Sequence, residues 1–279
     1  MLYLVGTPIG NMADISPRAV ETLKLSDVIL CEDTRVTGIL LNNLGIEGKK
    51  FISYHEHNKA SRKDMVTDLL SKELNVVQVS DAGMPVISDP GEDLVTIAAE
   101  NGFEVTCIPG PTAAMTAAAI SGIDARFIHF EGFLPSAGAA RTDRLSTLAK
   151  SEDTLILYEA PHRIVKLCED LEKAGFAGRK ISFCRELTKR YEEVIRLNTE
   201  EAKDYFEKNP PKGEFVVVIE GNSASADSEN VITEEKTEEL KEHLIKSGLS
   251  MKDVAKALSI ATGRGKNEIY KELLSDNNN

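Results

Sequence analysis

The first 110 residues alternate short apolar runs with stretches of helical spacing, and this alternation most limits the folds open to the chain. The runs are rich in Val, Ile and Leu and occupy residues 2–5, 28–31, 51–54, 76–79 and 105–108. Helical patterns fill the intervals between them. Strands that alternate with helices usually pair in parallel and are covered by helices on both faces. The sequence therefore predicts an α/β fold with a largely parallel sheet.

Gly, Pro or polar residues follow each of the five runs, and the longest such loop spans residues 80–91, Ser-Asp-Ala-Gly-Met-Pro-Val-Ile-Ser-Asp-Pro-Gly. Loops at the carboxyl ends of parallel strands converge on one edge of the sheet, where such folds bind ligands. Asp81 and Asp89 can accept hydrogen bonds from hydroxyl groups, and Gly83 and Gly91 permit close backbone approach. Asp-Pro-Gly is also common turn chemistry, so a purely structural turn is the alternative.

The first loop, residues 6–11, reads Gly-Thr-Pro-Ile-Gly-Asn. A Thr-Pro pair interrupts any G-x-G-x-x-G fingerprint, and no G-K-[ST] follows as in a P-loop. A conventional dinucleotide-binding fold is therefore disfavoured, and the ligand need not carry a pyrophosphate.

The second half of the chain has a different pattern of apolar and helical segments. Five further strands are predicted at residues 127–130, 154–158, 181–184, 193–197 and 215–219, the last three with few helical residues between them, which favours antiparallel pairs. Helical patterns at 251–262 and 266–274, joined by Gly-Arg-Gly, have helix-turn-helix spacing. We expect α/β domains over 1–115 and 116–222, a linker over 223–232 and a helical extension over 233–279.

Charge and cysteine content limit the partners and the compartment. The net charge of −12 argues against broad, non-specific binding to nucleic acid, although local basic clusters remain possible. No signal peptide is apparent, and no apolar run approaches the roughly 20 residues of a membrane helix. The four cysteines are scattered without a C-x-x-C pair, which predicts buried reduced thiols and a cytoplasmic protein.

Few residues suggest a reactive centre. His55 and His57 resemble a metal-binding pair, but further ligands at suitable spacing are missing, so we predict no metal. Three roles remain open for this pair: substrate binding, a general base, or a plain surface loop without function. Asp33 follows the second strand and is either an acid–base group or a helix cap. No Ser-His-Asp or Cys-His arrangement supports covalent catalysis.

Seven ordered motifs point to a known family. They are residues 6–11, 32–35 (Glu-Asp-Thr-Arg), 80–85, 89–91, 109–113 (Pro-Gly-Pro-Thr-Ala), 131–135 (Glu-Gly-Phe-Leu-Pro) and 158–163 (Tyr-Glu-Ala-Pro-His-Arg). With them the chain resembles the tetrapyrrole-methylase (class III) group of S-adenosylmethionine enzymes, and within it the bacterial members that methylate ribosomal RNA. The resemblance covers nearly the whole chain, including the helical tail.

This resemblance implies 2′-O-methylation of a cytidine ribose in small-subunit ribosomal RNA by a homodimer of two-domain subunits, with S-adenosylmethionine in the cleft between the domains. The cofactor contacts carried over by motif are Ile9, Asp81, Ala82, Gly83, Val86, Thr112, Ala113, Glu159 and Leu187. Tetrapyrrole methylases have Gly-Pro-Gly-Asp where this chain has Pro-Ile-Gly-Asn at 8–11, which makes a tetrapyrrole substrate less expected.

Methyl transfer from a sulfonium needs alignment of donor and acceptor more than it needs a reactive side chain. A ribose hydroxyl is nevertheless a weak acid and gains from a proton acceptor, for which Asp33, His57 and Glu186 are the candidates.

A basic rim is the expected RNA contact, since phosphate contacts position a substrate without reading its sequence. We expect substrate contacts at Asn11 and at the basic residues Arg35, Arg141, Arg144, Arg163, Lys189, Arg190, Lys252, Lys256, Arg264 and Lys266. Two other readings are a methylase of the same fold that acts on a small molecule such as a corrin precursor, and a non-catalytic ribosome-associated binding module.

Overall fold

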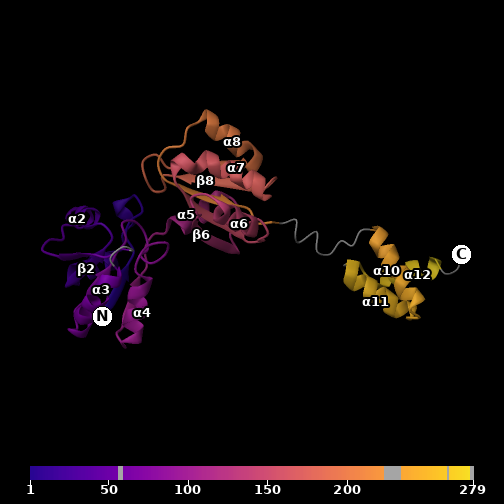
Figure 1. Ribbon diagram of the computed structural model, residues 1–279, viewed down its shortest axis with the longest axis horizontal. Coiled ribbons are helices and arrows are strands. Elements are labelled where there is room, and N and C mark those ends of the chain that lie inside the picture. The colour runs from indigo at the N-terminus through magenta and orange to yellow at the C-terminus, as the bar shows by residue number, and fades with distance from the viewer. Residues whose placement is uncertain (56–58, 223–233, 263, 277–279) are drawn as a thin grey trace. The chain divides into compact units, whose positions relative to one another are not determined.

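The computed structural model describes residues 1–55, 59–222, 234–262 and 264–276, and His57 lies outside them. These residues form two compact units. The first comprises Met1–Ser146 and Thr154–Glu220 and contains both sheets, and the second comprises Thr147–Asp153 and the described residues from Gly221 onward. Figure 1 shows both units and labels several of their elements.

The first sheet has five parallel strands in the order β3-β2-β4-β1-β5. The strands are β1 (Leu2–Val5), β2 (Val28–Cys31), β3 (Lys50–Ser53), β4 (Val76–Gln78) and β5 (Val105–Ile108). Helices α1 (Pro17–Leu25), α2 (Thr34–Asn43), α3 (Lys59–Ser71) and α4 (Glu92–Glu100) alternate with them. The parallel α/β arrangement predicted from the sequence is confirmed.

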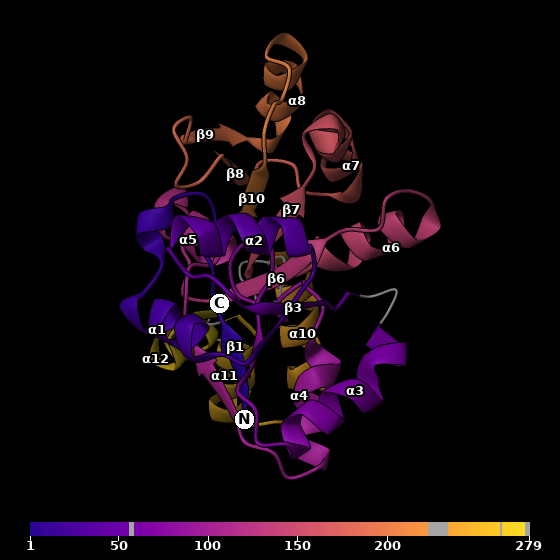
Figure 2. The same cartoon turned by 90° about the vertical axis from the view of Figure 1, so that its left-hand side faces the viewer.

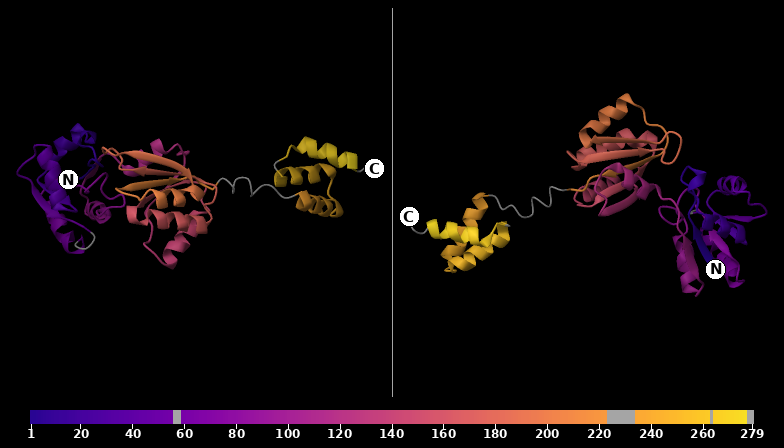
Figure 3. Two further views of the ribbon diagram at one scale, coloured as in Figure 1. Left: turned by 90° about the horizontal axis from the view of Figure 1, so that it is seen from above. Right: turned by 180° about the vertical axis from the view of Figure 1, so that it is seen from behind.

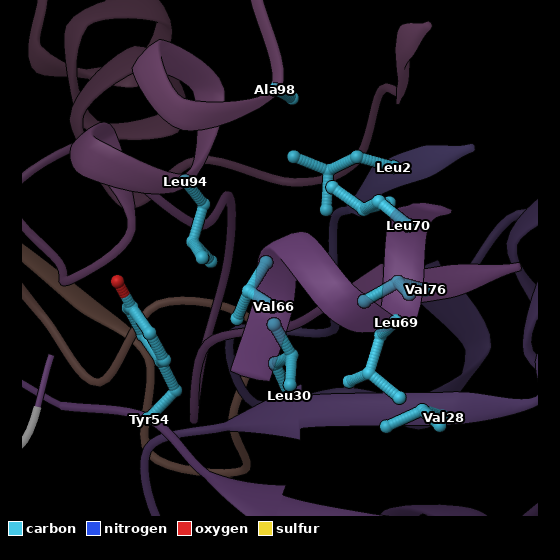
Figure 4. Packing of buried hydrophobic residues seen from close by; sticks show 10 residues of the cluster. All are labelled: Leu2, Val28, Leu30, Tyr54, Val66, Leu69, Leu70, Val76, Leu94 and Ala98. Atoms are coloured by element: carbon cyan, nitrogen blue, oxygen red, sulfur yellow. The ribbon is translucent and has the colours of Figure 1, made fainter. Parts of the chain in front are cut away.

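Two apolar layers cover this sheet, one on each face. On one face Leu30 and Val76 of the strands pack with residues of α3 and α4 such as Val66 and Leu94 (Figure 4). On the other face Ile29, Cys31 and Val77 pack with Ala19 and Leu23 of α1 and Leu41 of α2. Successive strand residues thus enter opposite layers, which is why these strands read as continuous apolar runs.

The second sheet has the order β6-β7-β10-β8-β9 (Figure 2). Its strands are β6 (Ile128–Phe133), β7 (Thr154–Glu159), β8 (Lys180–Arg185), β9 (Glu193–Asn198) and β10 (Phe215–Ile219). β6 and β7 pair in parallel, while β7–β10, β10–β8 and β8–β9 pair antiparallel. The antiparallel pairs predicted for this half of the chain are therefore present.

Helices also pack on the second sheet. Ala114, Ala117 and Ala118 of α5 (Ala113–Ser121) pack with Ile156 and Val218 in one apolar cluster. The ring of Phe206 in α8 (Thr199–Lys208) meets Phe183 of β8 edge to face with centroids 4.7 Å apart. The remaining helices of this half are α6 (Ala139–Leu148), the 3₁₀ turn η2 (Pro161–Arg163) and α7 (Ile164–Ala174).

The helical tail has its own small core. It consists of α10 (Glu234–Lys246), α11 (Met251–Thr262) and α12 (Lys266–Asp276), drawn in orange to yellow in Figure 3. Val254, Ala255 and Leu258 of α11 pack with Ile269 and Leu273 of α12. Both helices predicted at 251–262 and 266–274 are present.

One thiol departs from the prediction. Cys31, Cys168 and Cys184 are buried, but Cys107 is exposed. Cys107 lies on β5, an edge strand of the first sheet, where a strand neighbours it on one side only. Within the described residues, no helix is both long enough and apolar enough to cross a membrane.

Candidate cofactor and substrate site

A cavity of about 420 Å³ opens at the carboxyl ends of the first sheet's strands, within the first compact unit. Its size lies in the range of small-molecule sites. Loops after β1 and β4 and the start of α5 line it from the first sheet, and β6, β7, β10 and the segment after β8 line it from the second. The lining residues are Ile9, Ala82, Gly83, Met84, Ile87, Ser88, Asp89, Thr112, Ala113, Phe133, Tyr158, Glu159, Ala160, Pro161, Cys184, Leu187, Glu214, Phe215 and Val216.

Glycine allows the loops to meet. A Cβ on Gly6 would lie 2.6 Å from the Cα of Gly110, so the loops after β1 and β5 touch backbone to backbone. The amide of Thr7 donates to the carbonyl of Gly83 at 2.8 Å, which ties the first loop to the loop after β4. The predicted convergence of the strand-end loops is therefore present.

The loop at 80–91 has an unusual backbone. Besides Gly83 and Gly91, the non-glycine residues Val86 and Ser88 have positive φ values of 77° and 63°. Such conformations cost on the order of 1–3 kcal/mol each and occur often at functional sites. The loop also contacts the second sheet, since a Cβ on Gly132 of β6 would lie 2.6 Å from Ser88 Oγ. The strained loop thus closes one side of the cavity.

An aromatic wall lines the second-sheet side. The ring of Tyr158 meets Phe130 and Phe133 edge to face, with centroids 5.2 and 5.4 Å away. Phe133 lines the cavity although it is 58% exposed, which places it at the rim. The cavity-lining rings of Tyr158 and Phe133, together with Ile9 and Leu187, offer apolar surface of the kind that binds a purine ring.

A buried ion-pair network lies behind this wall. The carboxylate of Glu159, 1% exposed, pairs with Arg163 Nε at 2.6 Å and with an Nη atom of Arg141 at 3.3 Å. Arg141 Nε also donates to Asp170 at 2.7 Å. Because Arg141 is 5% exposed and committed to these carboxylates, its predicted place on an RNA-facing rim is wrong.

Seven of the nine predicted cofactor residues line the cavity: Ile9, Ala82, Gly83, Thr112, Ala113, Glu159 and Leu187. Asp81 and Val86 do not. Asp81 instead accepts a hydrogen bond from the backbone amide of Asp33 at 3.2 Å, and Val86 packs near Gly91 inside the loop. The contacts of all nine with a cofactor stay predictions.

The sequence did not assign Phe133 or Tyr158 to the site, although both lie within family motifs, which is the signal that could have found them. Asp89, expected as a hydrogen-bond acceptor in the loop at 80–91, does line the cavity. The sequence could not predict that Cys184 and Val216 line the cavity, because buried strand residues have the same sequence pattern whether or not they border a cavity.

Asp33 is held by its own helix. Its carboxylate accepts from the backbone amide of Arg35 at 2.8 Å and from the Arg35 guanidinium at 2.6 Å. These hydrogen bonds from Arg35 lower the pKa of Asp33 to about 2. The capping alternative is thus realised, and a carboxylate with so low a pKa is a weak proton acceptor.

Glu186 is likewise engaged in structural contacts. Its carboxylate accepts from the backbone amide of Glu214 at 2.9 Å and from Lys189 at 3.1 Å. The hydrogen bond from Glu214 and the charge of Lys189 lower the pKa of Glu186. Glu186 does not line the cavity, although its neighbour Leu187 does. A catalytic role for Glu186 remains a prediction that this geometry does not favour.

The predicted substrate residues of the first unit are mostly paired with acidic groups. Arg35 pairs with Asp33, yet its side chain is 87% exposed. Arg163 pairs with Glu159, and Lys189 pairs with Glu186 and with Glu214 at 2.9 Å. The Asn11 side chain accepts from the backbone amide of Ala13 and caps η1 (Met12–Asp14).

Arg144 and, in the tail, Arg264 show the same pattern. Arg144 pairs with Glu131 of β6, and Arg264 pairs with Glu268 and Glu272 of α12. Lys266 is exposed at the start of α12. Arg190, Lys252 and Lys256 are also exposed, and no ion pair holds these three or Lys266 among the described residues. RNA would therefore have to compete with acidic partners at Arg144 and Arg264 but not at these four cations.

Metal binding receives no support from the described side chains. Among them no group of three or more His, Cys, Asp and Glu residues is placed to hold a metal ion.

Known proteins of one family share the sequence pattern and the fold of this chain. The chain belongs to the tetrapyrrole (corrin/porphyrin) methylase family, whose model matches residues 1–203. The solved structures it resembles include a cobalt precorrin-4 methyltransferase (CbiF), with a TM-score of 0.60 at 18% identity over 78% of this chain and 94% of that one. Another is a uroporphyrin-III C-methyltransferase from Thermus thermophilus in complex with S-adenosylhomocysteine, with a TM-score of 0.56 at 18% identity over 81% of this chain and 99% of that one.

Sequence relatives are more specific. The chain is 42% identical to the ribosomal RNA small subunit methyltransferase I of Halalkalibacterium halodurans, over 96% of this chain and 93% of that protein. It is 41% identical to the protein of the same name from Synechocystis, over 97% of this chain and 96% of that protein. The family assignment made from the motifs is confirmed, and the chain is a methyltransferase of the class that uses S-adenosylmethionine.

The residues present fit that cofactor. An adenosyl group needs flat apolar surface, which Tyr158, Ile9 and Leu187 supply. Gly83 keeps one wall open, since a Cβ there would lie 3.2 Å from Ile9 Cγ2. The cavity volume also suits a ligand of nucleoside size.

Proposed function

We propose that this chain transfers the methyl group of S-adenosylmethionine to the 2′-hydroxyl of a cytidine ribose in small-subunit ribosomal RNA. The observation that carries the proposal is near-full-length similarity, at 42% identity, to a protein named for methylation of that RNA. A cavity lined by seven of the residues predicted to contact the cofactor supports it.

Positioning supplies most of the catalysis on this proposal. When bound, S-adenosylmethionine would supply an electrophilic methyl group on its sulfonium sulfur, with a neutral thioether as the leaving group. Tyr158, Ile9 and Leu187 hold the apolar part of the ligand, and the close packing of the loop at 80–91 against β6 excludes water. Thr112, which caps α5, fixes the polar edge of the same cavity.

The RNA contact is proposed for the exposed cations around the site and on the tail. The exposed cations among those predicted include Arg35, Arg190, Lys252, Lys256 and Lys266. We also propose that the protein is cytoplasmic and acts as a homodimer. A tetrapyrrole or other small-molecule substrate is the second candidate, favoured by the similarity of the fold to precorrin and uroporphyrin methyltransferases.

The test uses labelled S-adenosylmethionine and small ribosomal subunits from cells that lack the activity. Label on RNA, mapped to a 2′-O-methylcytidine, supports the proposal. Label on a tetrapyrrole precursor alone supports the second candidate, and tight RNA binding without transfer indicates a non-catalytic binding module.

A matched pair of variants tests the cavity. Ala113→Leu fills the cavity wall and should abolish S-adenosylmethionine binding measured by calorimetry. Ala119→Leu, on the exposed side of the same helix, should bind normally. Equal affinity in the two variants would place the cofactor elsewhere.

A further inference from the structure

Asp89 lies at the cavity, where its carboxylate accepts a hydrogen bond from Ser80. It lines the cavity in the strained loop, next to Ser88, which contacts β6. Tyr158 of β7 lines the same cavity, and the charge of Asp89 contributes to the raised pKa of its phenol. Among the described residues Asp89 forms no ion pair, unlike Asp33 and Glu186.

The other titratable side chains that line the cavity are committed or protonated. Glu159 is held by Arg141 and Arg163, and Glu214 by Lys189. Burial raises the pKa of Cys184 to about 11. Burial also raises the pKa of Tyr158, so its phenol remains protonated near neutral pH. Of the described acidic residues that line the cavity, Asp89 is thus the one whose carboxylate no cation holds.

The surroundings of Asp89 tune its basicity. Burial is the largest cause, and with the nearby carboxylates of Glu32 and Asp81 it raises the pKa of Asp89 to about 6, while a hydrogen bond from Ser80 acts in the opposite direction. Tyr158 of β7, which lines the same cavity, remains a neutral phenol because burial raises its pKa. A group that titrates just below neutral pH is largely ionised in the cell and still a useful proton acceptor.

We propose that Asp89 is the proton acceptor for the hydroxyl group that is methylated, an inference that rests on the proposed function. Asp89 takes the hydroxyl proton as the oxygen forms its bond to the methyl carbon. The bond from that carbon to the sulfonium sulfur breaks at the same time, and its electron pair stays on sulfur, leaving a neutral thioether. The carboxylate becomes a carboxylic acid, which releases its proton to solvent after turnover.

The first test measures Asp89 without catalysis. In protein labelled with carboxyl-¹³C aspartate, the resonance lost in Asp89→Asn identifies Asp89. It should titrate near pH 6 in the wild type and at lower pH in Glu32→Gln, which removes a neighbouring negative charge. A midpoint at or below pH 4 would overturn the proposal.

The second test measures single-turnover transfer to small ribosomal subunits at saturating S-adenosylmethionine. Asp89→Asn should lower the rate by about 10²–10⁴-fold with the cofactor Kd within threefold of the wild type. The wild-type rate should rise with pH through about 6, and in Glu32→Gln this rise should move to lower pH with the plateau retained. Glu32 is a suitable control because it does not line the cavity.

The outcomes separate the inference from the function. Wild-type transfer with an equally fast Asp89→Asn variant overturns the inference alone. If Asp89→Asn binds the cofactor more weakly but transfers methyl groups at the wild-type rate once saturated, Asp89 is a cofactor ligand, and this result also overturns the inference. A wild type that labels no RNA overturns the proposed function and the inference with it.

Discussion

Glu159→Gln should destabilise the first unit strongly, because Glu159 is the shared anion of a buried network. Its carboxylate is 1% exposed, forms an ion pair with Arg163, and accepts hydrogen bonds from Arg141 at 3.3 Å and from the backbone amide of Ala160 at 3.0 Å. Glutamine keeps the shape but removes the charge that compensates two guanidinium groups.

The structure sets the magnitude. Breaking a buried pair by removing one partner costs about 3–5 kcal/mol. Arg141 retains Asp170, and Arg163, 24% exposed, can turn toward water, so we expect the lower end, about 3 kcal/mol. For a unit of this size that corresponds to a drop in Tm of roughly 6–12 °C.

Thermal and urea unfolding followed by circular dichroism measure this effect. Glu193→Gln is the matched control, since Glu193 pairs with Arg185 at 3.2 Å but is 48% exposed. That control should lose less than about 1 kcal/mol. A Glu159→Gln loss as small as the control's would refute the argument that this network is a buried electrostatic support for the cavity wall.

Three further predictions follow from particular contacts. Gly6→Ala should prevent stable folding, since its Cβ would meet the Gly110 backbone, whereas Gly38→Ala in α2, with open space around it, should gain up to about 1 kcal/mol in urea unfolding. The native pKa of Asp89, about 6, lies above its unfolded value of 3.8. The free energy of unfolding of the wild type, measured by thermal unfolding, should therefore fall relative to that of Asp89→Asn as pH rises from about 4 to 6. The expected fall is about 1–3 kcal/mol. The RNA affinity measured by filter binding should weaken steeply as the salt concentration rises. An affinity that does not change with salt would contradict the proposed cationic contacts.

Much of the fold was predictable because it depends on local pattern. The strands of the first sheet pair in parallel as their alternation with helices indicated, and the antiparallel pairs of the second sheet follow from its sparse helices. The exposed Cys107 was missed because a strand at the edge of a sheet has the same apolar pattern as a central one.

The candidate site was predictable only in part. The motifs pointed to loops that do line one cavity, including those at Ile9, Gly83 and Thr112. The roles of the charged residues were harder to predict from the sequence. Asp33 was proposed as a base, yet the guanidinium two residues away holds its carboxylate, and Arg141 was placed on a rim although it is buried against Glu159.

By itself the sequence determined the class of fold, the family and the strand-end loops, because periodicity, turn chemistry and motif order are carried by neighbouring residues. The tertiary structure alone decided which carboxylates at the site are paired with cations and which is unpaired and able to accept a proton. Asp89 owes its basicity to burial and to Glu32, far away along the chain, and Glu159 owes its pairing with Arg141 to the packing of α6 beside β7. Charge–charge interactions depend on distance in space, and that distance is set only when the chain has folded.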